Sequence, residues 1–106
     1  MEKYFLKDFT GGWVVGNFNP TIFRNDIVEV AVKYFSSGES ELPHYQLIAS
    51  ELTIIAQGKI DINGTQYISG EIVLINPLEV ATFKCLEDCT LVCIKWPSIP
   101  ADKILS

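Results

Sequence analysis

Short apolar runs, each ended by glycine, proline, asparagine or serine, make up most of this sequence. In the clearest run, residues 27–35, valines alternate with Glu29 and Lys33, which is the pattern of a strand with one apolar and one wet face. About nine such runs follow one another, and no helical pattern appears before Pro100. The sequence therefore predicts an all-β fold, a jelly roll or a small barrel of antiparallel strands.

Two pairs of neighbouring runs are predicted to form hairpins. Asn63-Gly64 supplies both positive-φ positions of a type I′ turn, so the runs on either side of it should pair. The second pair, residues 79–86 and 89–96, would turn at Glu87-Asp88.

A chain of 106 residues is long enough for one domain. We expect the barrel to span residues 27–96, followed by a C-terminal arm at 97–106 that contains two prolines. In the preceding residues 1–26, the glycine-bracketed run 11–17 is typical of an outer strand. Because an unpaired strand edge invites pairing, residues 1–26 are predicted to lie at a homodimer interface.

Composition excludes several classes of partner. Thirteen acidic against eight basic residues give a net charge of −5, which disfavours binding to a nucleic-acid backbone. No apolar run is long enough for a membrane span. At the N-terminus, Lys7 and Asp8 interrupt what would be the apolar core of a secretory signal, so a cytoplasmic location is expected.

The three cysteines, Cys85, Cys89 and Cys93, follow one another at every fourth residue. Their odd number and the absence of a C-x2-C spacing favour reduced, packed thiols. A redox or metal cluster is the alternative. It would require the three to converge, whereas residues four apart on an extended strand lie about 13 Å apart.

The segment from Gly38 to Gly58 places polar residues where a β protein usually has valine or isoleucine. His44, the only histidine, shares a strand face with Gln46. If the chain bends sharply at Ala49-Ser50, Glu51 turns to the same space, and Thr53 and Ile55 lie on the face of Glu51. A convergent imidazole, amide and carboxylate are predicted inside the barrel.

The spacing of Gly38, His44, Gln46, Glu51 and Gly58 resembles the first motif of the cupin superfamily, with Gln46 in place of its second histidine. The resemblance implies a cupin-type jelly-roll β-barrel of two antiparallel sheets and a dimer formed through N-terminal strands. It also implies a divalent metal (Mn, Fe, Zn or Ni) held by His44, Gln46 and Glu51 at the barrel mouth. The second cupin motif begins at Gly70 but is eroded, because Ala81 occupies the place of its histidine.

Two functions of different class are compatible with these residues. The first is binding of a small polar molecule by His44, Gln46 and Glu51, acting as a hydrogen-bonded cluster with or without a weakly held metal. The second is a metal-dependent cupin enzyme, an isomerase, epimerase or dioxygenase acting on a sugar or a small organic acid. No set of nucleophile, base and orienting group can be assembled from the sequence. The expected pocket residues are His44, Gln46, Ile48, Glu51, Thr53, Ile55, Ala81 and Phe83.

Overall fold

The computed structural model describes all residues, 1–106, and is built almost entirely from antiparallel strands. Its elements, in chain order, are two 3-10 turns and eight strands: η1 (Leu6–Asp8), η2 (Thr10–Gly12), β1 (Trp13–Val15), β2 (Glu29–Phe35), β3 (Ser40–Gln46), β4 (Ser50–Ile62), β5 (Thr65–Ile68), β6 (Ile72–Ile75), β7 (Ala81–Trp96) and β8 (Lys103–Leu105). Neither helical turn is long and apolar enough to cross a membrane. The predicted all-β class is confirmed.

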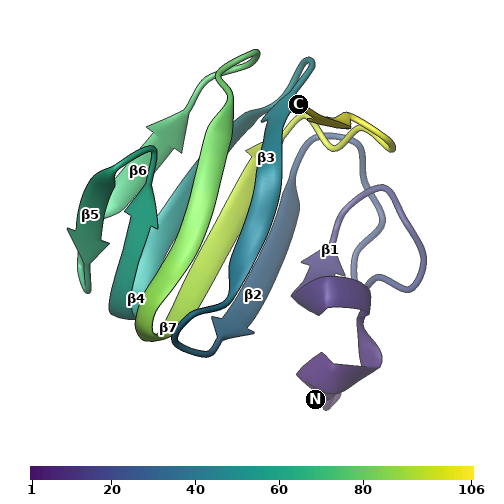
Figure 1. Cartoon of the computed structure of the whole chain (residues 1–106). Coiled ribbons are helices and arrows are strands. Elements are labelled where there is room, and N and C mark those ends of the chain that lie inside the picture. The colour runs from purple at the N-terminus through teal and green to yellow at the C-terminus, as the bar shows by residue number, and fades with distance from the viewer.

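Two long strands, β4 and β7, each take part in two sheets. The first half of β4 and the second half of β7 join β6, β2 and β1 in the order β6-β4-β7-β2-β1, here called the first sheet. The other halves join β5, β3 and β8 in the order β5-β4-β7-β3-β8, the second sheet. The two sheets curl around a common interior (Figure 1), which is the jelly-roll arrangement of two antiparallel sheets that the sequence predicted.

Gly58 lies where β4 bends from one sheet to the other. Its φ of 92° is in the left-handed region, and the register between β4 and β7 shifts three times between Ile55 and Ile60. Ile55 and Ile60 are both fully buried although they are five positions apart, an offset that would place them on opposite faces of a regular strand. The bend therefore changes which residues of β4 face the interior.

The hairpin predicted at Asn63-Gly64 is confirmed. Both residues have positive φ, 53° and 85°, and β4 and β5 pair on either side of them. The hairpin predicted around Glu87-Asp88 is wrong, because β7 continues through these residues and pairs with β4 along its length. Glu87-Asp88 lacks the glycine that a two-residue hairpin turn favours, and β4 offers a partner to both halves of the strand.

The three cysteines are free and buried along β7. Cys85 Sγ lies 3.4 Å from Cys89 Sγ, so the bend in β7 brings them much closer than an extended strand would. Burial, more than any other cause, raises the pKa of the Cys89 thiol to about 12 and of the Cys93 thiol to about 11. Both thiols are therefore protonated and weakly nucleophilic at neutral pH.

The N-terminal segment covers its own strand edge. β1 pairs with β2 on one side, and on the other side Ile22 N donates to Val14 O at 2.8 Å while Val15 forms a bridge with Phe23. The edge that was expected to attract a partner is thus largely satisfied within the chain. The C-terminal residues 97–106 end in β8, which adds an edge strand to β3 and is not a free arm.

Candidate functional site

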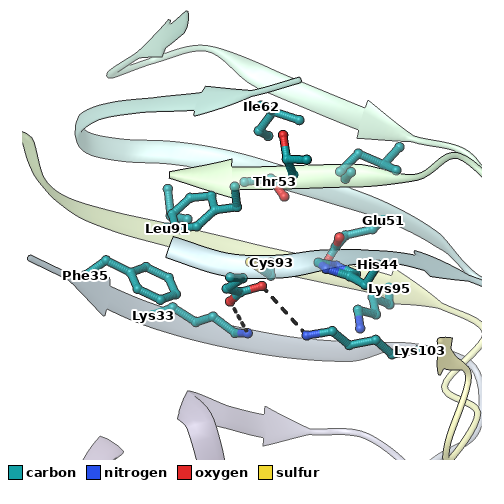
Figure 2. A pocket seen from close by; sticks show the side chains of 15 residues that line it. Lys33, Phe35, His44, Glu51, Thr53, Ile62, Leu91, Cys93, Lys95 and Lys103 are labelled. Carbon is teal, nitrogen blue, oxygen red and sulfur yellow. Dashed lines mark ion pairs between the residues drawn. The ribbon is translucent and has the colours of Figure 1, made fainter. Parts of the chain in front are cut away.

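A small cavity of about 50 Å³ lies between the two sheets. Figure 2 shows His44, Glu51 and Thr53 among the side chains that line it, with Phe35 and Leu91 toward its apolar end. Of the residues predicted for the pocket, five line this cavity: His44, Glu51, Thr53, Ala81 and Phe83.

Three other residues predicted for the pocket lie elsewhere. Ile55 is fully buried in the hydrophobic core, two residues after Thr53 on β4. Ile48 is 53% exposed, because β3 ends at Gln46 and the chain turns before the alternation could continue. Gln46 lines a neighbouring depression.

The neighbouring depression, here called the outer hollow, has a volume of about 370 Å³. Trp13 and Phe18 form part of its wall, and Lys95 and Lys103 line both the outer hollow and the inner cavity. Gln46 is only 2% exposed, and neither its amide oxygen nor its amide nitrogen has a hydrogen-bond partner. A buried amide without partners costs free energy, so a ligand or water that supplied hydrogen bonds would stabilise this site.

The chain bends between β3 and β4 at Leu47-Ile48, two residues before the predicted position Ala49-Ser50, and Asp102 holds this bend. Its buried carboxylate accepts hydrogen bonds from Ile48 N at 2.9 Å and from Ala49 N at 2.9 Å. The bend turns Glu51 inward, as the sequence predicted. Asp102 was not predicted, because 54 residues separate it from Ile48 and nothing in its neighbourhood in the sequence indicates an anchor.

His44 is held in one orientation by the backbone. Its Nδ1 lies 3.1 Å from Leu42 O, a contact in which Nδ1–H donates and Nε2 is left free to accept. The residue is 8% exposed and its ring lies beside Glu51 in the cavity (Figure 2). The imidazole can thus accept a hydrogen bond from a ligand hydroxyl or amide.

Three lysines that the sequence analysis did not select also line the cavity. Lys33, Lys95 and Lys103 come from β2, β7 and β8. Lys33 is on the face of β2 predicted to be wet, but this face is turned to the barrel interior, while the valines face outward. At Lys95, β7 is paired on both sides, with β2 and with β4. The signal that could have identified Lys95 is its position two residues after Cys93 and four after Leu91, on the strand face that these buried residues share.

Glu41 partly compensates these charges. Its carboxylate lies 3.8 Å from Lys33 Nζ and 3.7 Å from Lys103 Nζ, the two ion pairs drawn in Figure 2. Lys95 makes no ion pair, and its ammonium group lies 4.9 Å from the centre of the Trp13 ring. Opposite Lys95 in the register is Glu29, whose pKa is raised chiefly by burial and lowered in part by Lys95.

The residues present do not fit a tightly held divalent metal. No group of three His, Cys, Asp or Glu side chains lies close enough together to hold an ion. Gln46 lines the outer hollow, whereas His44 and Glu51 line the inner cavity. The ammonium groups of three lysines line that same cavity, where they would repel a cation. The metal inferred from the sequence resemblance therefore gains no support from the geometry.

Comparison with known proteins identifies the fold but no family by sequence. No protein-family model matches the chain, and no curated protein matches it. Solved structures do resemble it. An uncharacterized conserved protein with a double-stranded β-helix domain from Klebsiella pneumoniae is 19% identical, with a TM-score of 0.70 over 77% of this chain and 72% of that one.

Two further structures agree with this similarity. An RmlC-like cupin from Shewanella frigidimarina is 16% identical, with a TM-score of 0.66 over 72% of this chain and 71% of that one. The DMSP lyase DddQ from Ruegeria pomeroyi is 16% identical, with a TM-score of 0.71 over 89% of this chain and 49% of that one. At these identities the likeness concerns the fold, and this chain has the cupin fold, the double-stranded β-helix that its first motif predicted.

Proposed function

We propose that this protein binds a small polar organic molecule at the mouth of its barrel. The observation that carries the proposal is the unpartnered, buried amide of Gln46 in an outer hollow that adjoins a polar inner cavity. A volume of about 370 Å³ is in the range of small-molecule sites, and apolar walls with a few convergent polar groups are typical of them. His44, Glu51 and Thr53 would orient the polar end of the ligand.

A metal-dependent isomerase, epimerase or dioxygenase remains the second function considered. One protein of this fold is a DMSP lyase, so the fold is compatible with catalysis. For this chain, however, the donor set does not fit a metal, and the one histidine contacts a backbone carbonyl through Nδ1 and is hydrogen-bonded to no nucleophilic side chain. Binding is therefore the better supported function.

Filling the inner cavity should weaken binding without unfolding the protein. Ala81 is buried against the cavity, and Ala81→Val adds two methyl groups that occupy part of its volume. In amide ¹H–¹⁵N spectra titrated with a panel of hydroxy acids, sugars and amides, we expect at least one compound to shift cavity residues of the native protein. Ala81→Val should weaken its binding about tenfold or more, which corresponds to about 1.4 kcal/mol.

Ala56→Val provides the matched control, since Ala56 lies on β4 and is exposed. This variant should bind as the native protein does. A panel in which no compound shifts any cavity residue would contradict the proposed function. Unfolding midpoints that rise with Mn, Fe, Zn or Ni, and cease to rise in Glu51→Ala, would instead favour the metal-dependent enzyme.

We further propose that two copies pair through the outer face of the first sheet. This face carries eight aliphatic and no charged side chains in two cross-strand rows: Leu74, Leu52, Ile94 and Val30, then Ile72, Ile54, Val92 and Val32. Ile72 and Leu74 are more than half exposed. The outer face of the second sheet differs, because Lys59, Asp61 and Lys84 lie on it.

A second copy of the chain is the occupant that this face suits. An aliphatic sheet packs against its own copy under twofold symmetry without complementary charges. Copies with a net charge of −5 repel each other least where neither presents a charge. Three strands of about seven residues, with four residues in β6 and three in β1, spaced about 4.8 Å apart, give a flat footprint of roughly 440 Å². With side-chain relief added, this is the size of a weak interface, below the about 800 Å² per partner of a standard one.

A charge in the centre of this face should separate the copies. We expect sedimentation to give a dimer for the native protein at tens of micromolar and a monomer for Leu52→Glu, because an unpaired carboxylate would be buried in the interface. Ile72→Glu, at a more exposed position, should act in the same direction. Gln57→Glu, an exposed position on the same strand, should leave the dimer intact. A native protein that sediments as a monomer would contradict the proposal.

A further inference from the structure

The ammonium groups of Lys33, Lys95 and Lys103 gather at one end of the cavity. Figure 2 shows Lys33 and Lys103 pointing toward one another, with Lys95 beside Lys103 and with His44 and Glu51 close by. The three lysines come from three separate strands, so the fold and not the local sequence brings them together. Such a concentration of positive charge is unexpected in a chain with only eight basic residues and a net charge of −5.

The negative charges around the cavity do not balance these lysines. Lys33 and Lys103 share the single carboxylate of Glu41, and Glu51 makes no ion pair although it lines the same cavity. Counted over the lining of the inner cavity alone, three ammonium groups face two carboxylates. Lys95 is the lysine without a carboxylate within ion-pair distance.

Two further carboxylates border the outer hollow, those of Glu29 and Asp102. Glu29 lies opposite Lys95 on β2, but no ion pair joins the two side chains. Burial raises the pKa of Glu29, while Lys95 lowers it in part. The carboxylate of Asp102 accepts hydrogen bonds from two backbone amides and forms no ion pair with Lys95 or Lys103.

Lys95 and Lys103 stand at the boundary between the inner cavity and the outer hollow, since they alone among the lysines line both. A ligand that enters from the hollow meets these two ammonium groups before it reaches His44. Because the site is partly withdrawn from water, the attraction between an ammonium group and an anion is stronger there than on an open surface.

We infer, building on the function proposed above, that the ligand is a small monocarboxylic acid whose carboxylate group lies between Lys95 and Lys103. There the carboxylate would pair with Lys95, the lysine of the cavity that has no carboxylate within ion-pair distance. The inner cavity of about 50 Å³ accepts a group no larger than this headgroup. The rest of the molecule occupies the outer hollow, where the buried Gln46 amide gains the hydrogen bonds that it lacks within the chain.

The wall of the hollow indicates what the remainder of the acid is like. Trp13 and Phe18 meet edge to face there, with ring centres 6.5 Å apart. This apolar wall opposite an amide suits an acid with an aromatic or alkyl body and one hydrogen-bonding group. A phosphate dianion would bring two negative charges beside the carboxylates of Glu41 and Glu51, and arginine, its usual bidentate partner, does not line the cavity.

The test compares two probes that differ only in charge, phenylacetate and phenylacetamide, with inorganic phosphate as a third. Amide ¹H–¹⁵N titrations of the full chain give the dissociation constants. We expect phenylacetate to shift residues around the cavity and to bind about tenfold or more tightly than phenylacetamide. Lys95→Gln and Lys103→Gln should each weaken phenylacetate binding about tenfold, while Lys84→Gln, an exposed lysine on the same strand as Lys95, should not.

The outcomes separate this inference from the function on which it rests. Lys103 is partly exposed, so Lys103→Gln keeps the test decisive if Lys95→Gln does not fold. Equal binding of the acid and the amide would overturn the carboxylate class but leave small-molecule binding standing. Tighter binding of phosphate at the same lysines would overturn it as well. If phenylacetate bound but neither lysine variant weakened it, the placement of the carboxylate would be wrong. If no probe shifted any cavity residue, both proposals would fail.

Discussion

Replacing Gly58 by alanine is expected to lower the free energy of unfolding by about 3 to 4 kcal/mol. The φ of 92° at this residue costs an L-amino acid about 1 to 2 kcal/mol. An added Cβ would also overlap the carbonyl oxygen of Asp88 and lie 2.7 Å from Cys89 Cα, and both are backbone atoms that cannot rotate away. Overpacking of this kind costs about 1 to 3 kcal/mol more.

Gly70→Ala is the matched control for this substitution. Gly70 has nearly the same φ, 89°, but an added Cβ would meet nothing within 4 Å. Only the conformational cost applies, so we expect a loss of about 1 kcal/mol. Urea unfolding of the two variants and the native protein measures both effects. Equal losses at Gly58 and Gly70 would mean that the close approach of β4 to β7 at the bend does not stabilise the fold.

The fold was largely predictable because it depends on local patterns that repeat along the chain. Alternation predicts strands, and Asn63-Gly64 predicts its hairpin through turn chemistry alone. The prediction failed at Glu87-Asp88, where two polar residues interrupt an apolar run without forming a turn. There β7 passes from one sheet to the other, and pairing with β4 decides the local structure.

The site was predictable only in part, for the same physical reason. His44 and Glu51 belong to a short segment whose alternation and bend place them together, and both line the cavity. Lys33 and Lys103 lie on strands far apart in the sequence, so their meeting at Glu41 depends on register across the barrel. Alternation also misassigned the faces of β2, because it cannot say which face of a strand is turned inward.

Gln46 illustrates the limit most clearly. Its position on the face of His44 was correct, yet two residues along a strand move a side chain by about 7 Å. This distance is enough to carry its amide from the inner cavity to the outer hollow. The three residues that motif spacing placed in one ligand set therefore line two adjacent compartments, the inner cavity and the outer hollow. The lysines at their boundary, and not the motif residues, determine which charge the site accepts.

Substituting Asp102 by alanine is the second change expected to have a large effect, with a loss of about 3 to 4 kcal/mol in the free energy of unfolding. It would leave the amides of Ile48 and Ala49 without acceptors at a bend where Ala49 is buried, and each lost charge-assisted hydrogen bond costs about 1.5 to 3 kcal/mol. Because this bend directs Glu51 into the cavity, the variant should also bind the cavity ligand less tightly.

Two control variants separate the effect of losing the hydrogen bonds at this bend from the general effect of removing an acidic side chain. Asp102→Asn keeps one acceptor oxygen and should lose roughly half as much stability as Asp102→Ala. Asp88 also accepts a backbone hydrogen bond, from Ser37 N at 2.8 Å, but at an exposed position, so Asp88→Ala should cost less than about 1 kcal/mol. Urea unfolding measures all three variants. If Asp102→Ala proved no more destabilising than Asp88→Ala, the bend between β3 and β4 would be set by strand pairing alone, and the inward orientation of Glu51 would not depend on the C-terminal segment.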